Sequence, residues 1–148
     1  MVLAMAWKGE WQPFFDTLAQ AAEAQTSIRD YIQGEKVIQG FLLAYLHVSD
    51  FLLSHSEAEF SKGYADLFLE PFLAKYTEIP YGYLIELKYF KRGELTDSKQ
   101  KKAIREAKAQ LKRYLQDERL AAYPSHVQFF GLALVYHGWE LVYLKEVL

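Results

Sequence analysis

Two carboxylates and a lysine stand in the middle of the chain at a spacing that could build a metal site. Asp66 lies in YADLFLE, and twenty residues later Glu86 and Lys88 lie two residues apart in YGYLIELKYFKRGE. Side chains two residues apart on a strand point to the same face of a sheet, so Glu86 and Lys88 project together. If the two segments are neighbouring strands, Asp66 joins them there. Mg²⁺ is usually held by one or two carboxylates together with water and substrate phosphate, so this set could hold it.

Glu35 adds a third carboxylate to the candidate site. It lies three residues before Ile38 and seven before Leu42, within the apolar stripe of a predicted helix. A carboxylate that faces a sheet is costly unless it meets a cation, a metal or hydrogen-bond donors. We therefore expect Glu35 to face the same site as Asp66.

Simpler interpretations of these charged residues stay open. Glu86 and Lys88 could form an ion pair on an exposed strand edge, and Glu35 could mark the border of the buried face of its helix. Glu57 and Glu59, at the end of the preceding strand, could help to orient metal-bound water or could simply carry surface charge.

Helices and strands that would position these residues follow one another in an irregular order. Ser27 is a candidate N-cap with Asp30 three residues later, a near-match to a capping box. Apolar spacing predicts helices that end at about Ala24, extend from Ser27 to Leu46, and extend from Ser98 to Leu120. The predicted strands are Phe51–Glu57, Tyr64–Leu69, Tyr83–Phe90, Val127–Tyr136 and Trp139–Val147. This order predicts an α/β fold, a mixed β-sheet flanked by helices without repeated βαβ units.

The composition indicates a single soluble domain. The chain has 148 residues, of which 51% are hydrophobic, which favours one packed core over disorder. It contains no cysteine, which excludes disulfides, thiolate zinc sites and a cysteine nucleophile. No apolar run approaches the roughly 18 residues of a membrane span, and the start lacks the pattern of a signal peptide. We therefore expect a cytoplasmic protein that does not enter a membrane.

The order of Asp66 and Glu86-Leu87-Lys88 resembles the D…(D/E)-x-K core of the PD-(D/E)xK nuclease superfamily. Glu35 matches the acid often found on the first helix of that family. The segments GEKVIQGFLLAYL, SEAEFSKGYADLFLEPF and YGYLIELKYFKRGE most resemble the nuclease-like domain found at the C-terminal end of certain bacterial AAA-ATPase-like proteins. In one departure from the motif, Ala65 stands where the superfamily's name has proline.

This resemblance implies a restriction-endonuclease-like fold and a metal-dependent active site. Residues 1–26 would be a helical segment that follows an ATPase-like portion, and residues 27–148 would be the nuclease-like domain. The catalytic residues would be Glu35, Asp66, Glu86 and Lys88, with Mg²⁺ or Mn²⁺ as the cofactor. The metal ligands would be Asp66, Glu86, the carbonyl of Leu87, and Glu35 directly or through water.

Positive charge is concentrated directly after the candidate site. Ten Lys or Arg residues and three acidic residues lie between Lys88 and Arg113, a local balance of +7 in a chain whose net charge is −2. Many of the cations fall on one predicted helical face, which could follow a phosphate backbone, although such runs are also typical of solvated faces. The residues that we expect to contact nucleic acid are Lys91, Arg92, Lys101, Arg105, Lys108, Gln110 and Tyr114.

Gln110 and Tyr114 fit the Gln-x-x-x-Tyr signature of exonuclease-like members of the superfamily. They lie four residues apart, so they share one face of the predicted helix. The alternative is that Gln110 is simply a good helix former and that Tyr114 packs in the core with Ala107 and Leu111.

Three functions are compatible with the sequence. The leading hypothesis is Mg²⁺-dependent hydrolysis of DNA, because an active site that had lost its activity would have no physical reason to keep buried acids. The alternative is a catalytically silent module of nuclease fold that binds nucleic acid or protein for an AAA-ATPase-like portion. The third is a homodimerisation domain that uses the edge of its C-terminal hairpin.

Overall fold

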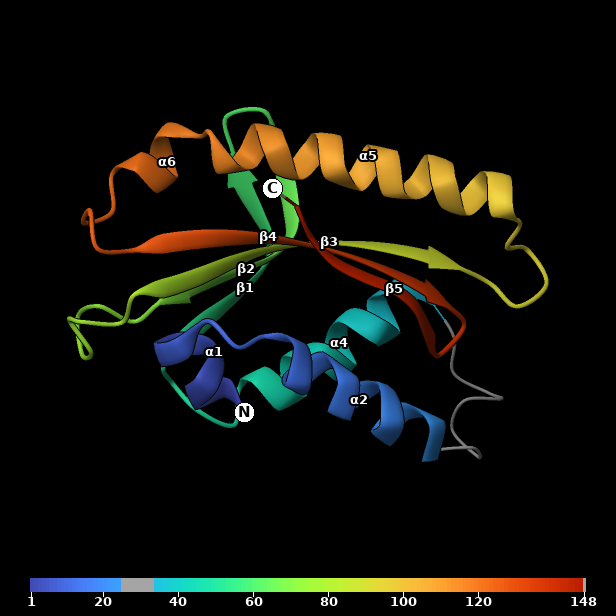
Figure 1. The fold of residues 1–148 in the computed structure, drawn as a ribbon, viewed down its shortest axis with the longest axis horizontal. Coiled ribbons are helices and arrows are strands. Elements are labelled where there is room, and N and C mark those ends of the chain that lie inside the picture. The colour runs from blue at the N-terminus through green and yellow to red at the C-terminus, as the bar shows by residue number, and fades with distance from the viewer. Residues whose placement is uncertain (25–33, 148) are drawn as a thin grey trace.

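The computed structural model describes residues 1–24 and 34–147 of the chain, which form three layers (Figure 1). A five-stranded sheet lies between α1, α2 and α4 on one side and α5 and α6 on the other (Figure 1). The helices are α1 (Val2–Lys8), α2 (Gln12–Ala24), α4 (Glu35–Leu46), α5 (Asp97–Leu115) and α6 (Glu118–Ala121). The strands are β1 (Leu52–Phe60), β2 (Gly63–Pro71), β3 (Tyr81–Phe90), β4 (Gln128–His137) and β5 (Glu140–Val147).

The sheet has the strand order β1-β2-β3-β4-β5. β3 and β4 are parallel, and the other neighbouring pairs are antiparallel. Parallel strands need a long crossover connection, and α5 supplies it over one face of the sheet. The structure thus confirms the predicted α/β fold, a mixed sheet flanked by helices. No helix among the described residues is both long enough and apolar enough to cross a membrane.

Alternate residues of β3 enter two different cores, one on each face of the sheet. Ile85 and Leu87 pack with α1, α2 and α4, whereas Leu84 packs with α5. Because side chains alternate along a strand, Glu86 and Lys88 project from the face that α5 covers. The predicted common face of this pair is confirmed, and α5 is the helix that lies over it.

Residues 1–24 pack against the sheet. Met5 and Phe15 are fully buried in the same core as Ile85. The hydroxyl of Tyr83, which lies in β3, donates a hydrogen bond to the carbonyl of Met5 at 2.7 Å. The predicted boundary between residues 26 and 27 and the predicted N-cap with Ser27 and Asp30 fall outside the described residues.

The helix predicted from Ser98 to Leu120 is wrong at its C-terminal end. α5 ends at Leu115, and α6 is a separate short helix. Asp117 accounts for the break, because its carboxylate accepts the backbone N–H of Arg119 as the N-cap of α6. The same carboxylate accepts the backbone N–H of Ser61, so it also ties this end of the helical layer to the β1–β2 turn.

Candidate active site

β2 separates from β3 at Asp66, and the carboxylates of the candidate site lie where the strands part. Among the described residues, the β2 positions that pair with β3 are Leu67–Leu69, whereas β2 stays paired with β1 as far as the hairpin turn. The Glu86 carboxylate accepts the backbone N–H of Asp66 at 3.4 Å, and the Asp66 carboxylate accepts the backbone N–H of Leu87 at 2.7 Å. Each carboxylate therefore accepts a hydrogen bond from a backbone N–H of the neighbouring strand. This N–H is not used in the pairing of β2 with β3.

Burial makes this carboxylate pair electrostatically unusual. Glu86 is 3% exposed, and its burial together with the charge of Asp66 raises the pKa of Glu86 to about 8. Burial also raises the pKa of Asp66, while the hydrogen bond from Leu87 opposes that rise. Within residues 1–24 and 34–147, neither carboxylate has a Lys, Arg or His nitrogen within 4.0 Å. A buried carboxylate beside a half-buried one, without such a partner, needs a shared proton or a metal cation.

The raised pKa of Glu86 predicts that the metal-free protein loses stability as the pH rises. The folded state keeps this proton up to about pH 8, whereas the unfolded state releases it near pH 4.5. Between these values the folded state binds more protons, so the stabilising contribution is complete below pH 4.5 and is lost as the pH rises through 8. Glu86→Gln, which keeps the neutral shape, should raise the Tm at pH 8.5 in EDTA by roughly 3 °C or more.

Melting curves recorded from pH 5.5 to 8.5 in EDTA measure this effect. Glu78→Gln, at an exposed loop position before β3, is the matched control and should follow the wild-type pH dependence. Equal pH slopes for Glu86→Gln and the wild type would contradict the raised pKa.

Lys88 is held by α5 and not by Glu86. Its ammonium group donates a hydrogen bond to the Gln110 side-chain oxygen at 3.1 Å and lies 4.0 Å from a Glu106 carboxylate oxygen. Among the described residues, Lys88 and Glu86 form no ion pair within 4.0 Å. The simple interpretation of the two residues as an ion pair on a strand edge therefore does not describe this structure. The Lys88 side chain is 23% exposed, so the surrounding residues cover most of it.

Glu35 lies on the first turn of α4, half-buried and near the carboxylate pair. Burial raises the pKa of Glu35, and the charge of Asp66 raises it further. Within the described part of the chain, however, no three acidic or histidine side chains come together as a ready-made metal cluster. Asp66 with Glu86 forms the compact pair, and Glu35 stays a predicted member of the site.

Gln39 is a site residue that the sequence analysis missed. Its side-chain amide donates a hydrogen bond to the carbonyl of Asp66 at 2.8 Å, and the residue is 5% exposed. The feature of the sequence that could have indicated this role is the polar amide directly after Ile38, within the apolar stripe of α4. Lys36 supplies a second link to the hairpin through its ion pair with Glu57. Glu57 is the single non-glycine residue with a positive φ, 55°, among the described residues.

Gln39→Leu should destabilise the protein, because it leaves the part-buried carbonyl of Asp66 without its donor. The expected loss is about 1–3 kcal/mol in the free energy of unfolding, measured by urea denaturation. Gln20→Leu, on the exposed face of α2, is the control and should stay within about 0.5 kcal/mol of wild type. Equal stability of the two variants would show that Gln39 does not hold the Asp66 backbone.

Gln110 and Tyr114 lie on the site side of α5 but make different contacts. Gln110 binds Lys88, as described above. Tyr114 is 3% exposed, and its hydroxyl donates a hydrogen bond to the carbonyl of Tyr64 at 3.2 Å. Its ring also stacks on Phe60, so the described contacts of Tyr114 join α5 to the β1–β2 hairpin.

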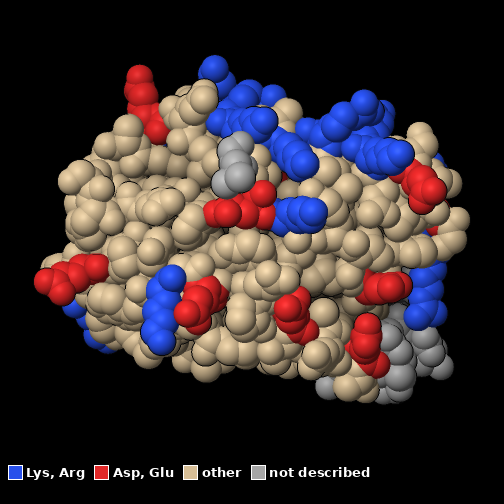
Figure 2. All heavy atoms as spheres, viewed as in Figure 1, with Lys and Arg blue, Asp and Glu red and all other residues tan. Residues whose placement is uncertain are grey.

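The predicted basic face of α5 points away from the candidate site. At 3.6 residues per turn, Lys101, Arg105 and Lys108 lie roughly 120–180° around the helix axis from the edge that carries Glu106 and Gln110. Figure 2 shows Lys and Arg side chains gathered over α5. Helical periodicity identified this cluster, but it could not tell which edge of the helix faces Lys88.

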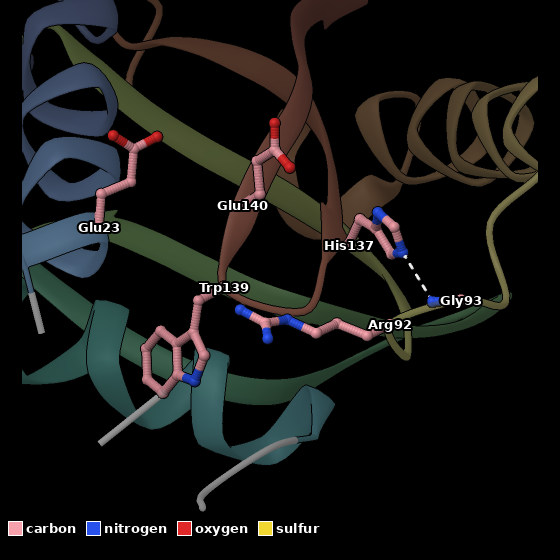
Figure 3. Close-up of a pocket in the computed structure, with 6 residues that line it drawn as sticks. All are labelled: Glu23, Arg92, Gly93, His137, Trp139 and Glu140. Atoms are coloured by element: carbon pink, nitrogen blue, oxygen red, sulfur yellow. Dashed lines mark hydrogen bonds between the residues drawn. The ribbon is translucent and has the colours of Figure 1, made fainter. Parts of the chain in front are cut away.

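Lys91 and Arg92 are exposed and follow the end of β3. Arg92 extends along the β4–β5 turn and lines a pocket that is distinct from the carboxylate pair (Figure 3). The backbone N–H of Gly93 donates a hydrogen bond to the His137 imidazole across one side of this pocket. The lining residues in the described part of the chain are Glu23, Arg92, Gly93, His137, Trp139 and Glu140. Asp66, Glu86 and Lys88 are not among them.

Comparison with known families agrees with this geometry. A sequence model of the PD-(D/E)XK nuclease superfamily matches residues 33–146. The chain belongs to this superfamily. The restriction-endonuclease-like fold expected from the resemblance is confirmed. No curated protein and no solved structure matches the chain.

Proposed function

We propose that this PD-(D/E)XK nuclease-family chain hydrolyses phosphodiester bonds of DNA and requires Mg²⁺ or Mn²⁺. The observation that carries the proposal is the pair of the buried Glu86 and the half-buried Asp66, neither of which has a cationic partner within 4.0 Å among the described residues. As an element of a stable fold this pair is unfavourable, since either carboxylate is costly to bury in its charged form. As a binding site for a hard cation, the same pair supplies the oxygen ligands that are needed.

The donor set fits a magnesium ion. Asp66 and Glu86 would be its direct ligands, with the Leu87 carbonyl as a third and Glu35 acting directly or through water. Two carboxylates suffice, because Mg²⁺ usually keeps several waters and shares substrate phosphate oxygens. When bound, the ion supplies positive charge to phosphoryl oxygens that become more negative in the transition state.

Lys88 is the second source of positive charge at the reacting phosphate. Its ammonium group could stabilise negative charge on a phosphoryl oxygen or take part in deprotonating the attacking water at Nζ. Gln110 accepts a hydrogen bond from Lys88, so it is a positioning residue that sets the direction of the ammonium group. Gln39 acts in the same way on the other side of the site, through the backbone of Asp66.

The proposed substrate is DNA held mainly by its phosphates. Of the contacts predicted from the sequence, we keep Lys91, Arg92 and Gln110. Lys101, Arg105 and Lys108 lie on the far face of α5 and should contribute little, and Tyr114, 3% exposed, packs against the β1–β2 hairpin. Phosphate contacts do not depend on sequence, so we expect binding to be sequence-tolerant and to weaken steeply with salt.

A cleavage assay with the purified chain tests this proposal. Labelled DNA and labelled RNA of the same sequence are incubated in EDTA, Mg²⁺ or Mn²⁺, and the products are resolved by length. The proposal predicts cleavage of DNA that needs the metal and that is faster than cleavage of RNA. Faster cleavage of RNA would refute the proposed substrate, and cleavage that persists in EDTA would refute the metal requirement.

A further inference from the structure

The edge of α5 that faces the candidate site carries its own group of polar residues. Lys102, Glu106, Gln110 and Arg113 recur at steps of four, four and three residues and therefore lie on one side of the helix. We refer to these four residues as the site edge of α5. Gln110 and Glu106 are the residues that contact Lys88, so this edge lies directly beside the proposed reacting phosphate.

Glu106 lies between two lysines of this region. One of its carboxylate oxygens is 4.0 Å from the Lys88 ammonium nitrogen, and the other is 4.0 Å from that of Lys102. Its side chain is 53% exposed, so it reaches solvent at the rim of the site and not in the core. The Glu106 carboxylate therefore lies between two ammonium groups. A phosphate at the same place would contact the same two ammonium groups and would accept more charge-assisted hydrogen bonds than the carboxylate does.

Arg113 lies at the other end of the site edge, beside the β1–β2 hairpin. Its guanidinium is near the Tyr114 hydroxyl, where it opposes the rise in the pKa of Tyr114 that burial causes. That hydroxyl binds the carbonyl of Tyr64, two residues before Asp66. Lys102 and Arg113 thus lie on either side of the two residues that contact Lys88. They are separated along the helix axis by about 16 Å, which is roughly the length of five phosphate spacings of one DNA strand.

We propose that the site edge of α5 binds the phosphate backbone that flanks the reacting phosphate, and that Glu106 holds the position of one such phosphate in the free protein. This inference rests on the proposed function for the identity of its ligand, and it differs from the predicted contacts at Lys101, Arg105 and Lys108. The strand follows the helix edge from Lys102 to Arg113, and a backbone phosphate displaces the Glu106 carboxylate from Lys88 and Lys102.

The helix itself provides a matched control for the experiment. Lys102 and Arg113 are eleven residues apart on the site edge, and Lys101 and Lys112 are also eleven residues apart, each roughly 100° around the axis from its neighbour on the site edge. All four residues are exposed. The double variants Lys102→Glu/Arg113→Glu and Lys101→Glu/Lys112→Glu therefore change the net charge equally, on the same helix and with the same spacing.

The measurement is the affinity of a fluorescent 20-nucleotide DNA at several salt concentrations in EDTA. The site-edge double variant should bind about tenfold or more weakly, with a plot of log K against log[salt] that is shallower by about 1.4–1.8. The control double variant should lose about threefold or less. Glu106→Gln should bind about two- to fivefold more tightly than wild type, whereas Glu78→Gln should be unchanged. Melting curves of each variant verify that it is folded.

Equal losses in the two double variants, or a larger loss in the control, would overturn the proposed path of the strand. Unchanged or weaker binding by Glu106→Gln would overturn the assignment of Glu106 to a phosphate position. Because these measurements need no cleavage, they separate this inference from the proposed function. A wild-type chain that shows the predicted binding pattern but never cleaves DNA with Mg²⁺ or Mn²⁺ would contradict the nuclease proposal alone.

Discussion

Lys88→Ala should lower the rate of DNA cleavage by roughly 10² or more while leaving the fold and metal binding nearly intact. The reason is that the Lys88 ammonium group is not part of the packing of the sheet. Among the described residues, it contacts Gln110 and Glu106 at the rim of the site. Removal of the side chain therefore costs little stability, but it removes the fixed positive charge beside the phosphoryl oxygens. Single-turnover cleavage at saturating Mn²⁺, compared with wild type, gives the size of the effect.

Two further variants show whether this loss reflects a specific role of the amine. Lys88→Arg should not restore the rate, because a planar guanidinium that stays protonated cannot replace a compact ammonium group. Lys75→Ala removes an exposed lysine that pairs with Asp50, which is not a residue of the site, and it should cleave like wild type. If Lys88→Ala cleaves as fast as wild type, the assigned catalytic role of Lys88 is wrong.

Asp66→Asn should abolish detectable Mn²⁺ binding and lower cleavage by about 10³-fold. The asparagine keeps an oxygen that can accept the backbone N–H of Leu87, so the local structure should persist. It removes the negative charge that, together with the charge of Glu86, would make the pair a ligand set for a divalent cation in the proposed site. Isothermal titration with Mn²⁺ measures the binding directly and does not depend on catalysis.

The same substitution should make the metal-free protein more stable. Without the charge of Asp66, Glu86 no longer faces a second carboxylate, so the repulsion that raises its pKa is reduced. A higher Tm in EDTA together with lost metal binding is typical of a functional site that is maintained at a cost in stability. A lower Tm, with metal binding retained, would contradict the assignment of Asp66 as a metal ligand.

Local patterns in the sequence predicted most of the helices and strands and the shared face of Glu86 and Lys88. The alternation of polar and apolar residues in YGYLIELKYF placed Glu86 and Lys88 on one face, and the structure confirms that face. The strand containing Asp66 was predicted from its apolar run. Such periodicities reflect which side chains are buried, and they are easy to recognise within a short segment when the chain has many apolar residues.

What the sequence could not provide were contacts set by tertiary packing. Helical spacing identified basic residues on α5 but could not show which edge of the helix faces Lys88. The position of Gln39 under the Asp66 carbonyl depends on where β2 leaves β3, which no local pattern encodes. Asp117 ended the long helix because Ser61, from a distant turn, shares its carboxylate. In each case the deciding partner lies more than twenty residues away in the chain.

Metal-dependent cleavage by wild type and Asp66→Asn, measured side by side, tests the central claim most directly. Both proteins are incubated with the same labelled DNA in EDTA and in Mn²⁺, with Glu78→Gln as a folded control of equal charge change. The claim that Asp66 and Glu86 form the metal site of a nuclease predicts cleavage by wild type and Glu78→Gln in Mn²⁺ alone, and about 10³-fold slower cleavage by Asp66→Asn. Equal rates for wild type and Asp66→Asn, or a wild type that binds Mn²⁺ and leaves the DNA intact, would contradict it.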